Sequence, residues 1–201
     1  MAARSEKLHK KFNISVGLVH GPVVDRAGEK VCTNITNFDI HDIARVSRSV
    51  GVRKYYLINS LREQLMFADR VLDHWKTGYG KQYNPMRSTA LNMIETTESV
   101  EEAIERWHKE VGLKGLVVAT AARDFENLPN FSFRKLREKI EANPGQPILI
   151  LFGTGFGLHE DVLKLCDALI EPIRGASGDD YRHLSVRTAV SICLDRLFGL
   201  W

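Results

Sequence analysis

Cysteine is scarce in this chain. The 201 residues include only Cys32, Cys166 and Cys193, and no two of them have the C-x-x-C spacing. This number and spacing exclude a disulfide framework and the common cysteine-rich zinc sites. Cys166 and Cys193 lie among aliphatic residues, a setting typical of buried, unreactive thiols. We therefore expect a cytoplasmic protein that holds no metal ion.

A large charge of one sign and a long hydrophobic run are also missing. Lys and Arg number 28 and Asp and Glu 25, which gives a formal net charge of +3, and 44% of the residues are hydrophobic. This composition excludes a globally disordered chain. No apolar run approaches the ~20 residues that span a bilayer, and the run over residues 14–19 is too short for a signal peptide. We expect no membrane partner, and the small net charge permits a polyanionic partner without requiring one.

Short apolar runs alternate with helical patterns along the whole chain. The runs are rich in Val, Ile and Leu, which is typical of parallel strands covered by helices on both faces. The sequence therefore predicts an α/β fold with a mostly parallel sheet flanked by helices. The predicted strands are Ile14–His20, Lys54–Asn59, Leu91–Thr96, Gly115–Thr120, Pro147–Phe152 and Ala168–Ile173. The predicted helices are approximately Phe38–Val50, Leu61–Lys76, Ser99–Val111, Phe133–Ala142, His159–Cys166 and Leu184–Leu197.

We expect one domain over residues 14–201, preceded by a basic extension over residues 1–13. No internal repeat or linker divides the chain. Local signals support the predicted helix ends. They are a capping box of Ser60 and Glu63, glycines at the C′ positions Gly51 and Gly112, and the helix breaker Asn143-Pro144-Gly145.

Three connections are longer than a turn requires, at residues 21–36, 78–88 and 171–182. Functional sites of α/β proteins are commonly built from loops at strand ends. The second connection and its flank interleave aromatic and basic residues, a combination that holds single-stranded RNA by stacking and phosphate contacts. The same rings can instead fasten the loop to the core. The residues concerned are Trp75, Tyr79, Lys81, Tyr83 and Arg87.

One apolar run leads directly into three alternating glycines, Gly153, Gly155 and Gly157, and then into a helix. Glycine allows a backbone to approach a ligand closely and to present its N–H groups. The G-x-G-x-G spacing differs from the G-x-G-x-x-G of dinucleotide-binding folds, and no Lys-Ser/Thr follows to form a phosphate loop. The spacing disfavours a dinucleotide oxidoreductase, and by itself it is also compatible with a purely structural turn.

Three segments together resemble the SPOUT superfamily of RNA methyltransferases. Phe152–Leu163 is similar to the SpoU-like glycine motif, and His183–Thr188 is similar to the final motif of the family. Asp39–Gly51, which contains Arg45, resembles the first motif. The segments occur in family order and cover most of the chain. The pattern most resembles an uncharacterised bacterial group that is related to the guanine-N1 tRNA methyltransferases.

The resemblance implies an S-adenosylmethionine-dependent methyltransferase that acts on tRNA or rRNA, at a base nitrogen or a ribose 2′-oxygen. It also implies a deep trefoil knot near the C-terminus and a homodimer in which Arg45 of one subunit completes the site of the other. The last predicted helix carries an apolar stripe that suits either the core or a subunit interface. The resemblance assigns S-adenosylmethionine to Thr120, Ala121, Phe152, Gly153, Thr154, Gly155, Gly157, Ile173, Gly175, His183, Leu184 and Ser185.

Arg45, His183 and Asp180 are the candidate catalytic residues. An arginine remains protonated, so Arg45 would stabilise developing charge or lower the pKa of the acceptor. An imidazole and a carboxylate can each accept a proton, so either His183 or Asp180 can take the proton from the acceptor. The alternatives are a surface arginine, a histidine that bonds locally, and an acid that caps a loop. Arg187 is a candidate to bind a phosphate, the carboxylate of the cofactor or a partner subunit.

The chain departs from the family pattern at three positions. Gly155 or Thr154 replaces the acidic residue between the glycines, and His183 and Asp39 stand where the last and first motifs have asparagine. These departures make a base nitrogen as plausible an acceptor as a ribose oxygen. They also leave a second hypothesis open, a non-catalytic nucleotide- or RNA-binding α/β module.

Overall fold

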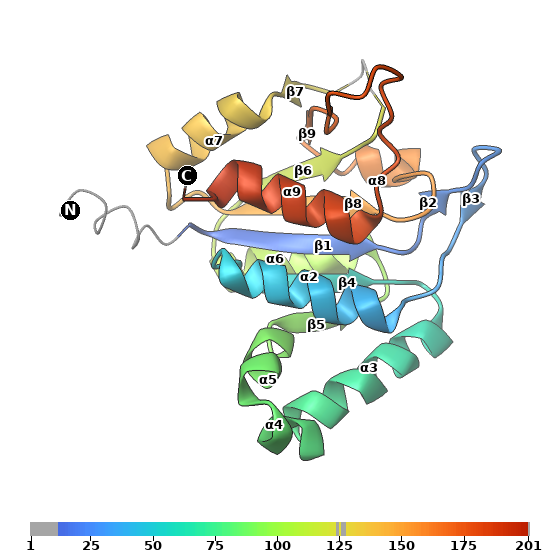
Figure 1. Ribbon diagram of the computed structural model, residues 1–201, viewed down its shortest axis with the longest axis vertical. Coiled ribbons are helices and arrows are strands. Elements are labelled where there is room, and N and C mark those ends of the chain that lie inside the picture. The colour runs from blue at the N-terminus through green and yellow to red at the C-terminus, as the bar shows by residue number, and fades with distance from the viewer. Residues whose placement is uncertain (1–11, 124, 126–127, 201) are drawn as a thin grey trace.

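The computed structural model describes residues 12–123, 125 and 128–200, and its main sheet is parallel throughout. Seven strands lie in the order β5-β4-β1-β8-β6-β9-β7 (Figure 1). Parallel pairing places all their carboxyl ends at one edge of the sheet. The strands are β1 (Ile14–Val19), β4 (Lys54–Ile58), β5 (Ile94–Thr97), β6 (Leu116–Thr120), β7 (Asn130–Phe131), β8 (Ile148–Gly153) and β9 (Ala168–Ile170).

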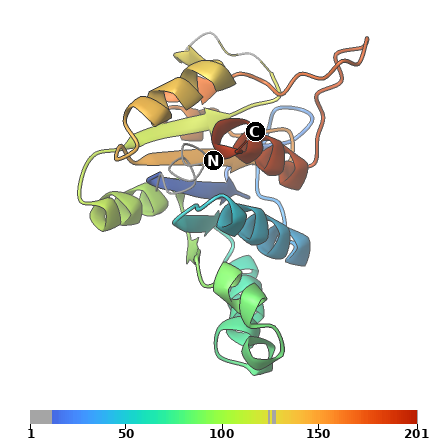
Figure 2. The ribbon, with the colours of Figure 1, turned by 60° about the vertical axis from the view of Figure 1, so that its left-hand side comes forward.

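Helices cover both faces of this sheet, and an arm of three helices extends beyond the β5 edge (Figures 1 and 2). The first face carries α2 (Asn37–Ser49), α7 (Phe133–Ala142) and α9 (Val186–Phe198), and the second carries α6 (Val100–Val111) and α8 (Glu160–Leu163). The arm consists of α3 (Arg62–Lys76), α4 (Tyr79–Tyr83) and α5 (Pro85–Leu91). Within the described residues, no helix combines the length and the apolar character needed to cross a bilayer.

The burial of the central strand β8 accounts for the apolar pattern from which the parallel sheet is predicted. Its residues Ile148–Phe152 are all buried, with β1 on one side and β6 on the other. Side chains alternate between the two faces, so a strand covered on both faces must be apolar at every position. On the second face, Trp107 of α6 is among the largest fully buried side chains.

Near residue 13, where we expect the domain to begin, the chain already contacts the rest of the protein. The ring of Phe12 packs on Phe198 with a centroid separation of 5.6 Å, and Asn13 N donates to Pro144 O. Residues 1–11, which make up most of the expected basic extension, lie outside the described residues.

Several predicted element boundaries are wrong for local reasons. The predicted strand Leu91–Thr96 begins only at Ile94, because Asn84 and Pro85 start helix α5, which continues to Leu91. The connection over residues 78–88 is therefore mostly helical. The strand expected over Ala168–Ile173 ends at Ile170, two residues before Pro172, which has no N–H to donate to a ladder.

The predicted capping box at Ser60 and Glu63 is also wrong. Leu61 is the N-cap residue of α3 and makes no side-chain cap bond, while Asn59 Oδ1 accepts from Leu61 N at 2.9 Å. The signals at the ends of α2, α6 and α7 are confirmed: Gly51 and Gly112 have positive φ angles of 82° and 73°, and α7 ends at Asn143.

A small antiparallel hairpin occupies part of the connection expected to be a loop over residues 21–36. It consists of β2 (Val23–Val24) and β3 (Lys30–Val31). Val24 N donates to Gly157 O at 3.0 Å, and Lys30 Nζ lies 2.9 Å from Asp161 Oδ2. The hairpin is thereby fixed to the segment that follows β8.

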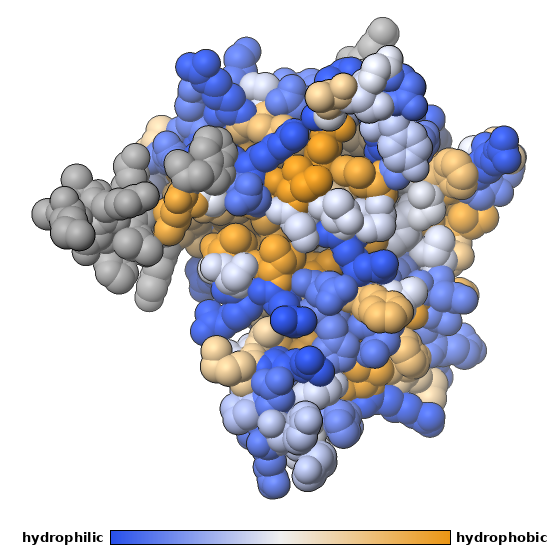
Figure 3. Space-filling view, viewed as in Figure 1, coloured by the Kyte–Doolittle hydropathy of each residue, from blue (hydrophilic) through white to orange (hydrophobic). Residues whose placement is uncertain are grey.

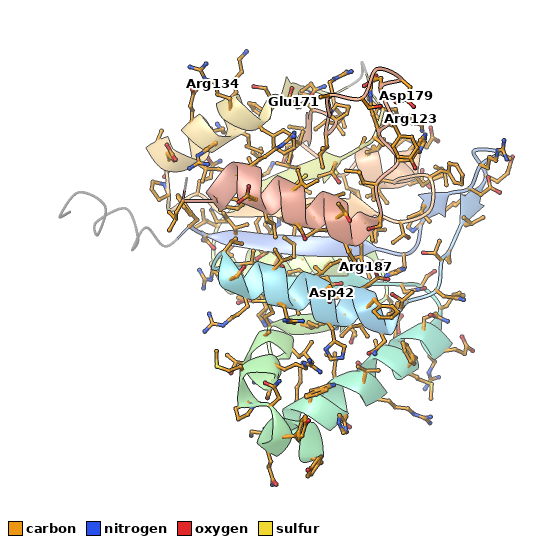
Figure 4. The ribbon with its side chains drawn as sticks, viewed as in Figure 1. Asp42, Arg123, Arg134, Glu171, Asp179 and Arg187 are labelled. Atoms are coloured by element: carbon orange, nitrogen blue, oxygen red, sulfur yellow. The ribbon has the colours of Figure 1, made fainter. Side chains whose placement is uncertain are left out.

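An ion pair joins helices α2 and α9, which lie side by side on the first face (Figure 4). Arg187 Nη1 lies 2.8 Å from Asp39 Oδ1, and the Arg187 Nε to Asp42 Oδ2 distance is 3.8 Å. Asp39 is 3% exposed, and its other carboxylate oxygen accepts from Thr36 Oγ1. The charge that Asp39 buries is thus paired and hydrogen-bonded, as a buried carboxylate requires.

His20, directly after β1, is a buried group whose charge the fold disfavours. The residue is 1% exposed, its Nδ1 lies 3.0 Å from Thr33 Oγ1, and its Nε2 has no partner among the described residues. Burial lowers its pKa to about 4, against the opposing effect of Asp39. The unfolded chain, with a histidine pKa near 6.5, binds a proton that the folded chain does not.

We predict that acid destabilises the wild-type chain more than a His20→Asn variant. Below pH 6.5 the unfolded state gains a proton, so the stability difference grows until the pH reaches the folded-state pKa of about 4. Between pH 7.5 and 5 the wild type should lose about 2 kcal/mol more of its free energy of unfolding. Urea titrations at both pH values measure this loss. His74→Gln, at an exposed histidine, is the control and should keep the wild-type pH dependence; equal losses in all three proteins would contradict the prediction.

Candidate active site

An open cavity of about 1390 Å³ lies at the carboxyl edge of the sheet. Its walls come from four parts of the chain: the ends of β6 and β8, the segment after β9, the start of α9, and the β2–β3 hairpin. In Figure 1 the hairpin lies at the right and the segment after β9 forms the red loop at the upper right. The switch in strand order around β8 and β6 places the cavity where α/β sheets commonly bind ligands.

Nearly all the residues to which the sequence assigned a cofactor line this one cavity. They come from segments separated by up to 65 positions (120 to 185), and the fold brings them together. Gly175 and Arg45 do not line it. The residues that do are Thr120, Ala121, Phe152, Gly153, Thr154, Gly155, Gly157, Ile173, His183, Leu184 and Ser185, together with Asp180.

The glycine motif forms a tight turn after β8 that needs glycine for steric reasons. A Cβ at Gly153 would lie 2.7 Å from Leu158 N. Gly155 has a φ of +59°, and a Cβ there would lie 2.9 Å from Val24 O. Gly157 has a φ of +111°, which side-chain-bearing residues rarely adopt. The turn therefore packs backbone against backbone, and its residues line the cavity.

The floor of the cavity is apolar and its rim is charged. Phe152, Ile173, Val186 and Cys193 contribute apolar surface, and burial raises the pKa of the Cys193 thiol to about 12. A thiol with that pKa is not a nucleophile near neutral pH. At the rim lie residues of both signs, among them Arg123, Glu171, Asp179, Asp180 and Arg182 (Figure 4).

The carboxylate of Asp180 is held in its charged form. It pairs with Arg182 and lies 3.4 Å from Arg174 Nη1, and the hydrogen bond from Arg182 is the main cause that lowers its pKa. A carboxylate with a lowered pKa is a weaker proton acceptor. His183 is exposed at the same rim, with its ring 5.8 Å from that of Tyr181.

Arg45 lies apart from the other candidate residues. It is exposed on α2 and does not line the cavity. Arg187, another candidate for ligand binding, is instead paired with Asp39 and contacts the exposed ring of Phe38 at 5.6 Å. Within one chain, the first motif therefore contributes to the site through helix packing and not through Arg45.

The aromatic residues around the arm divide into two groups. Trp75 packs against the core cluster, with His41 on one side and the Arg87 guanidinium 4.8 Å from its ring. Tyr79 and Tyr83 are 70% and 73% exposed and stack on each other at 6.0 Å. Trp75 therefore fastens the arm, while the two tyrosines remain available for contact.

Several residues of the cavity wall are not among the site residues expected from the sequence, although some lie in the long connections over 21–36 and 171–182. The hairpin residues Val24–Gly28 and Phe156 line the cavity, as do Arg123 and Glu171. The sequence Val-Val-Asp-Arg-Ala-Gly at residues 23–28 contains a turn signal next to β-branched residues, which is the pattern of a short hairpin. Glu171 has a structural function, since its Oε1 accepts from Phe133 N at 2.7 Å at the start of α7. In the described part of the chain, no cluster of three His, Cys, Asp or Glu residues is arranged to hold a metal ion.

Two relatives each match 93% of this chain. A protein of Oleidesulfovibrio alaskensis named tRNA (guanine-N(1)-)-methyltransferase is 42% identical over 188 residues, which is 93% of this chain but 42% of that protein. An uncharacterised protein of Aquifex aeolicus is 37% identical over 187 residues and is covered to 89% of its length. The chain thus spans less than half of the named relative and almost all of the other.

Solved structures share the fold at lower sequence identity. A probable methylase family protein from Haemophilus influenzae matches with a TM-score of 0.60 and 20% identity, over 94% of this chain and 66% of that one. A family model described as SAM-dependent RNA methyltransferase matches residues 13–199. This match includes every wall of the cavity, and the chain belongs to this family of SAM-dependent RNA methyltransferases.

Proposed function

We propose that this chain transfers a methyl group from S-adenosylmethionine to an RNA nucleotide at the carboxyl edge of the sheet. One observation carries the proposal: the residues of the glycine motif and of the final motif, far apart in the sequence, line a single cavity in a chain of this family. We also propose that the protein acts in the cytoplasm.

The cavity suits S-adenosylmethionine in its shape and in its polar groups. The apolar floor fits the adenine ring, and the main-chain groups around Gly153, Leu184 and Ser185 can bond the polar edges of adenine and ribose. The bound sulfonium supplies an electrophilic methyl group. Ser185 is the N-cap of α9, and its hydroxyl accepts from Thr188 N, which fixes this wall of the site.

Two residues at the rim of the cavity have different roles. Asp180 is paired with two arginines and keeps its negative charge, so its carboxylate orients the loop and balances the positive sulfonium. His183 has no carboxylate partner among the described residues and accepts the proton that the acceptor atom loses. Alignment of the donor and the acceptor supplies the remaining rate acceleration.

The substrate is tRNA, by analogy with the named relative. The guanine-N1 specificity in that name describes a protein of which this chain covers 42%. The acceptor atom of this chain is a base nitrogen or a ribose 2′-oxygen. The arm adds a contact surface for the same RNA, since Tyr79 and Tyr83 expose stacked rings beside Lys81.

We further propose a homodimer and a C-terminal knot. The face formed by α2 and α9 shows hydrophobic patches among hydrophilic residues (Figure 3) and exposes Phe38 to 67%. A twofold contact through this face carries Arg45 of one subunit to the cavity of the other. Strand β9 comes late in the chain yet lies between the earlier strands β6 and β7, an order that supports a threaded backbone.

A second candidate function is RNA or nucleotide binding without catalysis. One observation favours it: Gly155 or Thr154 stands where the related motif has an acidic residue, and among the described residues the turn over 153–158 contributes no carboxylate to the cavity wall.

We predict that Gly155→Ala strongly weakens the binding of S-adenosylmethionine. The new methyl group would meet Val24 O at 2.9 Å and would hold φ at +59°, a strain of about 1–2 kcal/mol before the clash is counted. Isothermal calorimetry should show at least a tenfold loss of affinity. Gly175→Ala is the matched control, because a Cβ there meets nothing within 4 Å. Equal affinity in the two variants, both folded by circular dichroism, would refute the assigned binding turn.

Deletion of the gene should remove one methyl mark from cellular RNA. Mass-spectrometric mapping of tRNA and rRNA identifies the nucleotide and the atom. Complementation with the wild-type gene should restore the mark, and complementation with Arg45→Ala should not. A modification map that is unchanged by the deletion would favour the non-catalytic alternative.

Mixed dimers test whether Arg45 acts across the subunit interface. Arg45→Ala and Gly155→Ala should each be inactive alone, because each homodimer lacks one part of both sites. Co-refolded in equal amounts, half of the dimers are mixed and each has one intact site, so methyl transfer should recover to about one quarter of the wild-type rate. No recovery in the mixture would place Arg45 outside the site of the partner.

A further inference from the structure

Phe156 presents an aromatic ring to the cavity at its open side. The residue lines the cavity and is 56% exposed. Its backbone is firmly held: Phe156 N donates to Val24 O at 2.9 Å, and Gly157 N donates to Thr154 O at 3.0 Å. The glycines on either side adopt positive φ angles of 59° and 111°, which define the path of the turn that carries the ring. The exposure of Phe156 is therefore built into the turn.

The adjacent β2–β3 hairpin presents a second side chain, the guanidinium of Arg26, to the same cavity. The Asp25 carboxylate accepts from Ala27 N at 2.8 Å and from Glu29 N at 2.9 Å, which closes the tip of the hairpin. Arg26 is exposed at this tip, lines the cavity, and forms no ion pair with any residue of the described chain. Val24, two positions earlier, is the residue that bonds Phe156, so the ring and the cation belong to one rigid unit.

The cavity has room for more than the methyl donor. Ligand pockets commonly have volumes of about 300–1,000 Å³, and this cavity measures about 1390 Å³. The residues proposed to bind the donor come mainly from the ends of β6 and β8 and from the segment before α9. Phe156 and Arg26 belong to the part of the wall where the turn after β8 meets the hairpin.

We propose that Phe156 and Arg26 hold the acceptor nucleotide of the RNA, with the ring stacked on its base and the guanidinium on a neighbouring phosphate. This assignment rests on the proposed function. Aromatic faces and arginines are the groups with which proteins hold unpaired RNA bases and their backbone. A base held there lies against the glycine turn, next to the main-chain groups assigned to the donor. Phe156 and Arg26 are positioning residues and take no part in proton transfer.

The test separates donor binding, RNA binding and the chemical step. The probe is the bulk tRNA pool of a strain that lacks the gene, with tritiated S-adenosylmethionine as donor. Phe156→Ala should raise KM for tRNA by tenfold or more, and Phe156→Trp should restore it, since base stacking on one ring commonly accounts for such factors. Arg26→Ala should weaken tRNA binding and reduce the salt dependence of that binding by about one counterion. Both variants should keep the wild-type affinity for S-adenosylmethionine and a kcat within about threefold.

Phe67→Ala and Arg48→Ala are the controls, at an exposed ring and an exposed cation outside the cavity. Filter binding of tRNA without the donor gives a result even if no methyl transfer occurs, so failure of the proposed function is recognised separately. The inference is overturned if Phe156→Ala binds tRNA as the controls do. It is also overturned if Phe156→Ala loses affinity for S-adenosylmethionine, which would make the ring part of the donor site, or if it turns a dimer into a monomer, which would make the ring an interface residue.

Discussion

The parallel pairing of β8 between β1 and β6 is the constraint on which the site depends. The register sets Gly153 opposite Val19, and the next residue continues the contact, since Thr154 N and Oγ1 both donate to Val19 O at 3.2 Å. Thr33 Oγ1, in the segment after β3, lies 2.5 Å from Thr154 Oγ1 and connects the end of the hairpin to the same point. The glycine turn, the end of β1 and the hairpin therefore form one unit, and the cavity wall follows from the sheet register.

The opposite wall depends on how α9 is placed against α2. Arg187 lies two residues after the Ser185 cap, within the first turn, so its pairing with Asp39 fixes the start of α9 and the residues there that face the cavity. A buried ion pair adds little net stability, whereas the loss of one partner is costly. In this protein the pair fixes the position of α9, because it joins Asp39 of the first motif to Arg187 of the last motif, 148 residues later in the chain.

The sequence predicts the layered fold correctly because its main signal is local and strong. Runs such as Ile148–Phe152 are apolar at every position only when both faces of a strand are covered. The hairpin was missed because strands of two residues, Val23–Val24 and Lys30–Val31, are too short to establish an alternating pattern. The predicted cap of α3 is wrong because the side chain of Asn59, and not that of Ser60, accepts from Leu61 N at the start of the helix. Asn59 Nδ2 also donates to Thr33 O, which holds the side chain in this position.

The convergence of the site residues was predictable only through resemblance to a family. Nothing in the local pattern around Thr120 or Ser185 shows that they face one cavity, because their proximity is set by strand order and not by spacing. Gly175, which the resemblance also assigns to the cofactor, lies outside the lining. Arg45 is a different case, since it does not line the cavity of its own chain and reaches a site only in the proposed dimer.

The most direct test of this account is a crystal structure of the chain with S-adenosylhomocysteine. The account predicts electron density for the ligand between the glycine turn after β8 and the segment 171–185, in contact with main-chain atoms of both. Density at any other place, or failure of the ligand to bind at millimolar concentration, would contradict it.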